Sequence, residues 1–238
     1  MLPSRLENKE ITVLWFYKIG KPVVWPFWKL VYPMRVLGRE NYPREGRVVT
    51  VCNHYSYTDP IHLIINLPRE IRFIGKKELW NSRFLKWVLE HVGAIPVDRG
   101  NVGLSTMKQC LSVLKREEVL TLFPEGRRNK DNEELMELKG GMAVFAVMGK
   151  APIVPMMLYR RPKLFQRNYL IIGEPIVLEE YYGRKLTEED FSAIDARISA
   201  VLNSLRERVP EKFRAKCERQ RQKALAKQQR RQSKKTRP

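Results

Sequence analysis

The sequence predicts an α/β domain with a mostly parallel central sheet flanked by helices. Two observations support this prediction. Short apolar runs of four to seven residues, typical of strands buried on both faces, recur along the chain, and segments with helical periodicity separate them. A helix between two strands carries the chain across the sheet, so the strands that it joins run parallel. The chain has 238 residues, which is enough for one domain with its own core.

The expected strands span residues 48–52 (VVTVC), 71–75, 94–97, 119–123, 152–158 and 169–173. The expected helices span residues 60–67, 79–91, 104–114, 134–149 and 191–205. In the last of these, apolar residues recur at three- and four-residue steps from Phe191 to Leu205, which predicts one buried stripe.

The N-terminal 40 residues have a composition of their own. Trp15, Trp25 and Trp28 lie among lysines in residues 11–34, and glycine and proline interrupt this segment. No apolar run here reaches the roughly 20 residues that a membrane-spanning helix needs. Aromatic residues beside lysines are typical of a membrane–water interface, so we expect residues 1–40 to form membrane-association helices. The alternative is that these aromatic side chains cover the core of a soluble domain.

The chain is strongly basic, with a formal net charge of +19. Residues 211–238 hold twelve Lys or Arg and two Glu, and the last 24 residues lack aromatic side chains. We therefore expect an α/β domain at 41–208 and a basic, disordered tail at 209–238. The charge points to a polyanionic partner, and the aromatic N-terminus favours an anionic membrane surface over nucleic acid.

The ends and the cysteines suggest a cellular location. The first residues, MLPSRLENKE, lack the apolar core of a signal peptide. Cys52, Cys110 and Cys217 are not spaced as metal ligands, and we expect them to be reduced thiols. We therefore expect a monotopic protein on the cytoplasmic face of the cell membrane.

His54 and Asp59 directly follow the first strand of the expected domain, in the sequence HYSYTD. Parallel sheets place their ligand crevices at the carboxyl ends of the strands. The carboxylate can reach one imidazole nitrogen, which leaves the other free to take a proton from a hydroxyl group. The alternative for Asp59 is an ordinary helix cap, because Pro60 follows it.

Two other chemistries would use the same residues. Cys52 would point to the same side of the strand as His54 and could act as a thiol nucleophile, although a cysteine that ends an apolar strand is typical of a core. His54, Asp59 and His62 could ligate a metal ion, but no fourth ligand is evident, so we expect no metal site.

Several cations also follow expected strands. In FPEGRRN, at 123–129, the glycine lets the backbone approach a ligand, and Arg127 and Arg128 can bind phosphate through paired hydrogen bonds. Lys76 and Arg99 follow two further strands. If these strands are neighbours, the cations share one rim of the sheet.

Four blocks, NHYSYTD, GAIPVDR, FPEGRRN and IVPMM, occur in an order and spacing that resembles the lysophosphatidate acyltransferase family of glycerolipid acyltransferases. The resemblance implies an enzyme of phospholipid biosynthesis, a 1-acylglycerol-3-phosphate O-acyltransferase. Such an enzyme transfers an acyl chain from an acyl thioester to the sn-2 hydroxyl of 1-acyl-glycerol-3-phosphate and makes phosphatidic acid. The resemblance also implies that no cofactor is needed. The co-substrate is acyl-CoA or acyl carrier protein, and the acceptor is a lysophospholipid.

The resemblance also implies roles for single residues. His54 matches the general base and Asp59 the group that orients it. The implied substrate-binding residues are Lys76, Arg99, Glu125, Gly126, Arg127, Arg128 and Pro155. Three positions depart from the family pattern: Lys86 replaces a glycine, and Arg127 and Asn129 replace a threonine and a serine. Arg128 is therefore the expected main phosphate ligand.

Two alternative functions remain open. The acceptor could be glycerol-3-phosphate or another lysolipid. A different class of function, a nucleic-acid-binding protein acting through the basic tail, fits the charge, although no nucleic-acid-binding motif is evident in the rest of the sequence.

Overall fold

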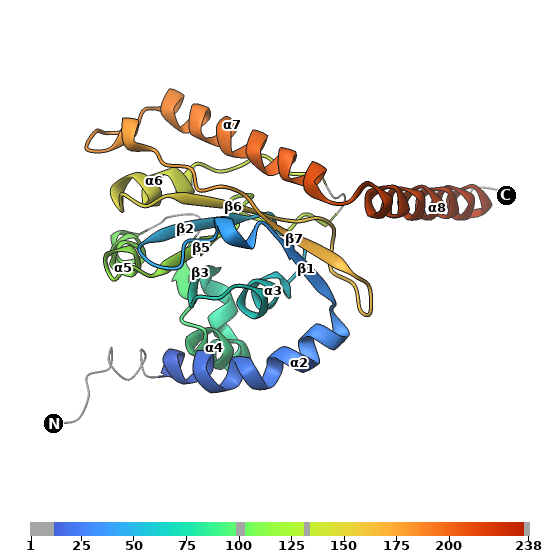
Figure 1. The fold of residues 1–238 in the computed structure, drawn as a ribbon, viewed down its shortest axis with the longest axis horizontal. Helices are drawn as coiled ribbons and strands as arrows, with labels where there is room; N and C mark the ends of the chain where they lie inside the picture. Colours follow the sequence, from blue (N-terminus) through green and yellow to red (C-terminus); the bar gives the residue numbers. More distant parts are fainter. Residues whose placement is uncertain (1–11, 99–102, 131–133, 236–238) are drawn as a thin grey trace.

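The computed structural model describes residues 12–98, 103–130 and 134–235. A sheet of seven strands, in the order β1-β7-β6-β2-β5-β3-β4, forms its centre (Figure 1). The strands are β1 (Met34–Leu37), β2 (Val48–Cys52), β3 (Ile71–Lys76), β4 (Ile95–Val97), β5 (Val119–Leu122), β6 (Ile153–Leu158) and β7 (Asn168–Ile172). Neighbouring strands of this sheet run parallel, except for the antiparallel pair β6 and β7. The prediction of a mostly parallel α/β sheet is confirmed.

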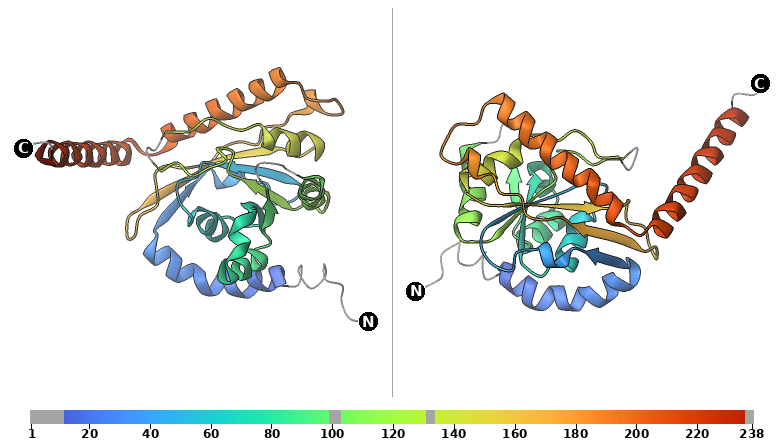
Figure 2. Two further views of the ribbon diagram at one scale, coloured as in Figure 1. Left: turned by 180° about the vertical axis from the view of Figure 1, so that it is seen from behind. Right: turned by 45° about the horizontal axis from the view of Figure 1, so that its top comes forward.

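Helices cover both faces of the sheet, with α5, α6 and α7 on one face and α2, α3 and α4 on the other (Figures 1 and 2). The longer helices are α2 (Lys21–Val31), α3 (Asp59–Asn66), α4 (Arg83–His91), α5 (Leu104–Lys115), α6 (Gly141–Met148), α7 (Glu188–Leu205) and α8 (Glu211–Lys235). Short π or 3-10 turns are η1 (Phe16–Gly20), η2 (Arg39–Asn41), η3 (Lys77–Asn81), η4 (Glu179–Tyr181) and η5 (Arg206–Arg208).

β2 contributes to two separate apolar cores. Val49 and Val51 belong to the core under α5, α6 and α7, whereas Val48 and Cys52 belong to the core under α3. Successive side chains of a strand point to opposite faces, which explains this alternation. All five residues of β2 are buried, so the strand is covered on both sides.

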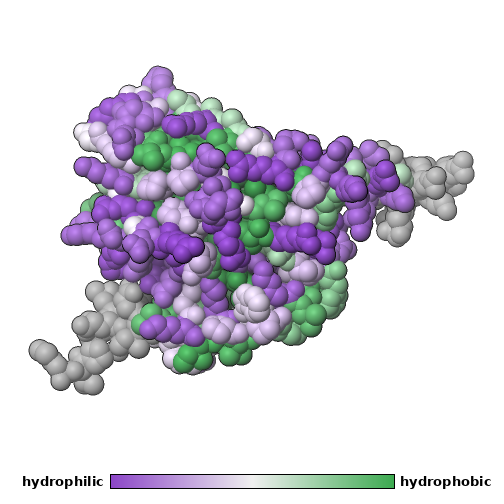
Figure 3. All heavy atoms as spheres, in the orientation of Figure 1, coloured by the Kyte–Doolittle hydropathy of each residue, from purple (hydrophilic) through white to green (hydrophobic). Residues whose placement is uncertain are grey.

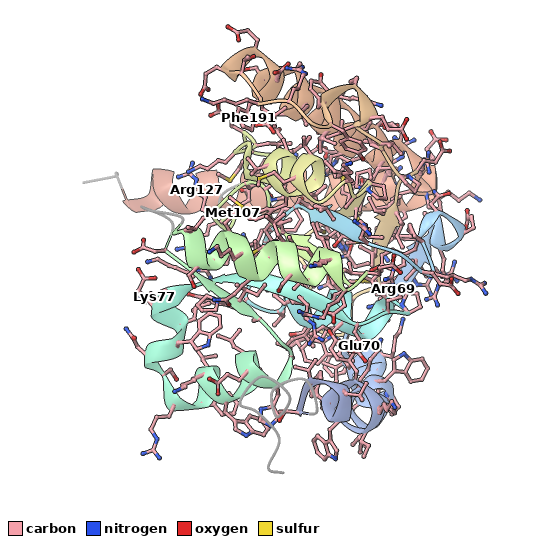
Figure 4. All side chains as sticks on the ribbon, turned by 90° about the vertical axis from the view of Figure 1, so that its left-hand side faces the viewer. Arg69, Glu70, Lys77, Met107, Arg127 and Phe191 are labelled. Atoms are coloured by element: carbon pink, nitrogen blue, oxygen red, sulfur yellow. The ribbon has the colours of Figure 1, made fainter. Side chains whose placement is uncertain are left out.

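The carboxyl ends of the central strands meet at one edge of the sheet. β2 lies between β5 and β6, with Val51 opposite both Leu122 and Pro155. Figure 4 shows Arg127 and Lys77, which follow β5 and β3, on one side of the molecule, and Arg69 and Glu70, which precede β3, on the other. Side chains that follow β2, β3 and β5 are thus brought to a common edge.

α2 packs against the C-terminal end of α3. Lys21 Nζ donates to the carbonyl oxygen of Leu67 at 2.7 Å, and Lys29 Nζ donates to Asn66 Oδ1 at 2.5 Å. The opposite side of α2 is exposed and apolar, and hydrophobic surface appears along the lower border of the molecule in Figure 3. Of the helices in the described ranges, none is long and apolar enough to cross a membrane.

One helix is shorter than the sequence predicts. The helix expected at 134–149 begins only at Gly141, and residues 134–140 form a loop. The backbone N–H of Met136 donates to Glu125 Oε2 at 3.1 Å, which ties this loop to the segment after β5. A tertiary hydrogen bond thus overrides the local helical periodicity.

The C-terminal tail, expected to be disordered, contains α8. Its sequence is rich in Ala, Gln, Lys and Arg, which have high helix propensity even where no apolar face exists. The ring of Phe213 near its start packs edge-on against Tyr159 and Tyr169, with ring centroids 5.7 and 4.8 Å apart. These contacts fix the beginning of the helix on the domain.

Candidate active site

His54 and Asp59 form a hydrogen-bonded pair at the carboxyl end of β2. Nδ1 of His54 lies 2.7 Å from Asp59 Oδ2. The same oxygen accepts the backbone N–H groups of Tyr55 at 2.5 Å and Ser56 at 2.7 Å. These donors hold the carboxylate in place, so it can fix the tautomer of the imidazole with the proton on Nδ1 and leave Nε2 as the free base.

The pair combines a sealed carboxylate with a reachable ring. The side chain of Asp59 is 0% exposed, whereas that of His54 is 13% exposed. Asp59 is the first residue of α3, and Thr58 stands at the N-cap position. Asp59 therefore accepts its hydrogen bonds from the turn that precedes the helix. It is not the N-cap residue, which was the alternative interpretation of this position.

Phe123, the residue after β5, lies flat against the imidazole of His54. The ring centroids are 4.1 Å apart and the planes differ by 19°. Phe73 of β3 is nearly parallel to Phe123, at 6.1 Å. One face of the imidazole is thus covered by an aromatic stack. This contact was not predicted from the sequence, although Phe123 begins the block FPEGRRN.

Glu125 joins the two loops that follow β2 and β5. Its Oε1 accepts the backbone N–H of His54 at 2.7 Å, and its Oε2 accepts that of Met136. The carbonyl oxygen of His54 in turn accepts the N–H of Asn129 at 2.7 Å. Burial raises the pKa of the Glu125 carboxyl, and the two N–H groups oppose this shift. Glu125, predicted to bind substrate, thus holds the backbone of His54 with one oxygen and that of Met136 with the other.

Arg128 lies on the same loop as Glu125. Its guanidinium stands 3.5 Å from the ring centroid of Tyr57, which belongs to the loop after β2. Arg127 is exposed, and Gly126 has a positive φ of 65°, a conformation that favours glycine in this turn. The structure therefore places Arg128 beside the histidine loop, and Arg127 is exposed on the same loop as Arg128.

The other predicted cations follow β3 and β4. Lys76 ends β3 opposite Val97, and its Nζ lies 2.8 Å from Glu78 Oε1. Arg99 lies outside the described residues. Lys86, which replaces a glycine of the family pattern, is exposed on α4, so its longer side chain meets no packing conflict.

Pro155 lies apart from the other predicted residues. It lies on the same face of β6 as Ile153 and Met157, which face the core under α7. The ring of Pro155 packs closely against Gly173, because a Cβ added at Gly173 would lie only 2.9 Å from Cγ of Pro155. Phe123, which covers His54, packs against the core on the other face of the sheet. The structure does not bring Pro155 to His54.

Two further side chains support the site and were not predicted. The amide of Asn53 exchanges two hydrogen bonds with the backbone of Leu158, at 2.8 and 3.0 Å, and so extends the pairing of β2 with β6. Arg161 donates to the carbonyl oxygens of Asn129 and Lys130 at 2.8 and 2.9 Å. Their positions, directly before His54 and just after β6, were the only signals in the sequence.

The alternative chemistries find little support. Cys52 is fully buried, burial raises the pKa of its thiol well above the usual value, and its Sγ faces Asn53 Oδ1 at 3.6 Å. A buried neutral thiol is a poor nucleophile. In the part of the chain that the structure describes, no group of three His, Cys, Asp or Glu could hold a metal ion. Nδ1 of His62 accepts a hydrogen bond from Trp28 instead.

Comparison with known proteins gives a consistent result. Residues 33–159 match the acyltransferase family. The 1-acyl-sn-glycerol-3-phosphate acyltransferase of Bacillus subtilis is 34% identical over 187 residues, covering 75% of this chain and 87% of that protein. The protein of the same name from Streptococcus pneumoniae is 30% identical over 176 residues, covering 71% and 61%. The crystal structure of the 1-acyl-sn-glycerophosphate acyltransferase from Thermotoga maritima has the same fold, with a TM-score of 0.62 at 22% identity, covering 87% of this chain and 83% of that one.

Proposed function

The chain belongs to the acyltransferase family, as the four sequence blocks predict, and we propose that it is a 1-acylglycerol-3-phosphate O-acyltransferase. It transfers an acyl chain from a thioester to the sn-2 hydroxyl of 1-acyl-glycerol-3-phosphate, giving phosphatidic acid and a free thiol. The observation that supports this most directly is the reachable imidazole of His54 held by the buried carboxylate of Asp59.

The reaction follows from this geometry. Nε2 of His54 removes the proton of the sn-2 hydroxyl while the oxygen attacks the thioester carbonyl carbon. Asp59 Oδ2 stabilises the imidazolium that forms. The tetrahedral intermediate then breaks its carbon–sulfur bond, and the thiolate takes the proton from His54. General-base catalysis of this kind contributes roughly 10² to 10⁴ in rate.

The cations at the same edge of the sheet bind the acceptor's phosphate. Arg128 is the main ligand, because its loop is hydrogen-bonded to the backbone of His54 on both sides. Arg127 and Lys76 contribute charge from the same edge. A planar guanidinium can form two parallel hydrogen bonds to a phosphate and so fix the direction in which the hydroxyl points.

The acyl donor is acyl-CoA or acyl carrier protein. A thioester is already activated toward attack, so the reaction requires neither a metal ion nor another cofactor.

We also propose that α2 and α4 rest on the membrane that supplies the acceptor. Their exposed apolar side chains are Val23, Val24, Trp25, Phe27, Leu30, Phe84, Leu85 and Trp87. Both helices lie at the lower border of the molecule, where Figure 3 shows hydrophobic surface. Side chains of this kind beside lysines are typical of helices at a membrane interface.

α8 does not share this face. It leaves the domain beside the end of α7, away from α2 (Figures 1 and 2). The membrane proposal therefore rests on α2 and α4, and the basic residues of α8 are a separate electrostatic surface. Flotation with anionic vesicles at high salt, which screens the charges of α8, tests the proposal: replacing Trp25 and Phe27 with serine should weaken vesicle binding, and unchanged flotation would contradict it. A gel shift with RNA tests the alternative function of α8.

A panel of substrates tests the proposed reaction. The purified protein is given labelled acyl-CoA or acyl carrier protein with lysophosphatidate, glycerol-3-phosphate or another lysolipid. Phosphatidic acid should form with lysophosphatidate and at least one donor. Transfer to glycerol-3-phosphate alone, or to no acceptor, would overturn the proposal.

A further inference from the structure

Asp59 and His62 each have one buried side-chain atom without a hydrogen-bond partner among the described residues. These atoms are Oδ1 of Asp59 and Nε2 of His62. Both residues are 0% exposed. They are three positions apart on α3 and therefore lie on neighbouring positions of one helix face. A buried polar atom without a hydrogen-bond partner lowers the stability of the folded protein, so its presence calls for a functional explanation.

Trp28 of α2 decides which nitrogen of His62 carries the proton. Its indole N–H donates to Nδ1 of His62 at 3.1 Å. An indole nitrogen can only donate, so Nδ1 must be the unprotonated nitrogen and the ring proton must be on Nε2. Burial lowers the pKa of His62 to about 4, although the charge of Asp59 acts in the opposite direction, so the ring is neutral at physiological pH. Nε2 of His62 is thus a donor, and Oδ1 of Asp59 is an acceptor.

The ring of His62 is also held by its surroundings. Trp28 and Tyr32 pack against it with ring centroids 5.3 and 4.9 Å away, and Tyr32 meets it edge-on. The backbone carbonyl oxygen of His62 accepts a hydrogen bond from the side-chain amide of Asn66, whose Oδ1 accepts one from Lys29 of α2. The orientation of His62 therefore depends on the docking of α2 on α3.

We infer that Trp28 and His62 are positioning residues for the proposed acyl transfer, with Nε2–H of His62 donating through one water molecule to Oδ1 of Asp59. This inference rests on the proposed function. It assigns one oxygen of Asp59 to His54 and the other to His62, so that the plane of the carboxylate is fixed from both sides. It also connects α2 with the base, through Trp28, His62 and Asp59.

Loss of the donor should change catalysis in two ways. The carboxylate keeps its hydrogen bonds at Oδ2 but loses the one at Oδ1, so its plane can tilt, His54 spends less time in the reactive orientation and kcat falls. The negative charge is also concentrated on Oδ2, which favours the imidazolium, so a higher pH is needed to obtain the neutral base. Glu125 and Cys52 are the other titratable groups that interact with Asp59, and burial raises the pKa of both. The KM for the acceptor should not change, because the phosphate is bound elsewhere.

The test uses Trp28→Phe, which keeps an aromatic ring but removes the N–H donor together with part of the indole ring. We expect kcat to fall about fivefold or more, as for the loss of one hydrogen bond, and the acidic limb of the pH–kcat profile to move to higher pH. Trp80→Phe, the same change on η3, is the matched control and should leave kcat and the profile unchanged.

Substitutions of His62 complete the design. His62→Leu removes both the acceptor and the donor and should reproduce the effect of Trp28→Phe. His62→Gln can still accept with its oxygen and donate with its nitrogen, so it should restore most of kcat. The double variant with Trp28→Phe and His62→Leu should be no slower than the worse single variant, because both changes break one network.

The outcomes separate this inference from the proposed function. If the wild-type protein transfers no acyl group to any acceptor, the proposed function fails. If the wild type is active and Trp28→Phe loses only resistance to denaturant, with wild-type kcat and pH profile, the positioning role is wrong. Trp28→Phe decides the matter even if His62→Leu does not fold.

Discussion

Phe123 stacks on the imidazole of His54, with ring centroids 4.1 Å apart, and closes one face of the catalytic ring. Stacking and the hydrogen bond to Asp59 together restrict the ring to one plane and one direction. Aromatic pairs contribute about 0.5 to 1.5 kcal/mol beyond the burial of their area.

Phe123→Leu should therefore lower kcat, because the side chain stays apolar but no longer holds the ring flat. We expect a decrease of about three- to tenfold, corresponding to the loss of that stacking energy in the reactive conformation. Steady-state kinetics at saturating acceptor measure the effect. Phe165→Leu, at an exposed position between β6 and β7, is the control. A wild-type kcat in Phe123→Leu would show that the stack has no catalytic role.

Arg128 and Arg127 should differ in their effect on the acceptor. Arg128→Ala should raise the KM for lysophosphatidate about tenfold or more, since a hydrogen bond to a charged group contributes roughly 1.5 to 3 kcal/mol. Arg127→Ala should raise it less, because this side chain is exposed and has no aromatic contact like that of Arg128 with Tyr57. Arg128→Lys should restore little, since an ammonium group lacks the planar pair of donors. Equal effects at both positions would count against this assignment.

His62 should make stability depend on pH. Its pKa is about 4 in the folded protein and 6.5 for the free side chain, so the unfolded state binds more protons between these values. The free energy of unfolding therefore contains a contribution that is present above pH 6.5 and lost as the pH falls toward 4, up to about 3 kcal/mol. Denaturant titrations across this window should show a shallower pH dependence for His62→Gln. The same change at His91, which is partly exposed on α4, is the matched control, and identical slopes for all three proteins would refute the buried neutral ring.

Cys52 should be chemically inert in the folded protein. It is fully buried and burial raises the pKa of its thiol, whereas Cys217 on α8 is partly accessible. Brief treatment with iodoacetamide should modify Cys217 and spare Cys52, as read by mass spectrometry of peptides, and activity should persist. Cys52→Ala should also remain active. Loss of activity that tracks alkylation of Cys52 would restore the thiol-nucleophile alternative.

The strands that position the site could be predicted because buried strands are short, locally apolar runs in the sequence. β2 is apolar at four of five positions, and its alternating side chains point into two cores on opposite faces of the sheet. β1 was not predicted, since it has only four residues and Arg35 interrupts it, and it exists because it pairs with β7. The helicity of α8 could not be predicted from hydrophobic periodicity, because this helix lacks an apolar face.

The catalytic pair could be predicted because His54 and Asp59 are close in the sequence. The side chains that hold this pair in place could not be predicted, since they come from distant segments. Phe123 comes from the end of β5, and Trp28 comes from α2. Glu125 was assigned to the site from the family pattern, but only the structure shows that it binds the backbone of His54. The family pattern also could not show on which face of the sheet Pro155 lies.

The central claim is that the imidazole of His54 is the general base for acyl transfer. Its most direct test is the rate of phosphatidic acid formation by His54→Ala, with His91→Ala, at a partly exposed position of α4, as the matched control. We expect the rate to fall by roughly 10² to 10⁴ in His54→Ala alone, with the denaturation midpoint within the range of the control. A folded His54→Ala protein that forms phosphatidic acid at the rate of His91→Ala would contradict the account.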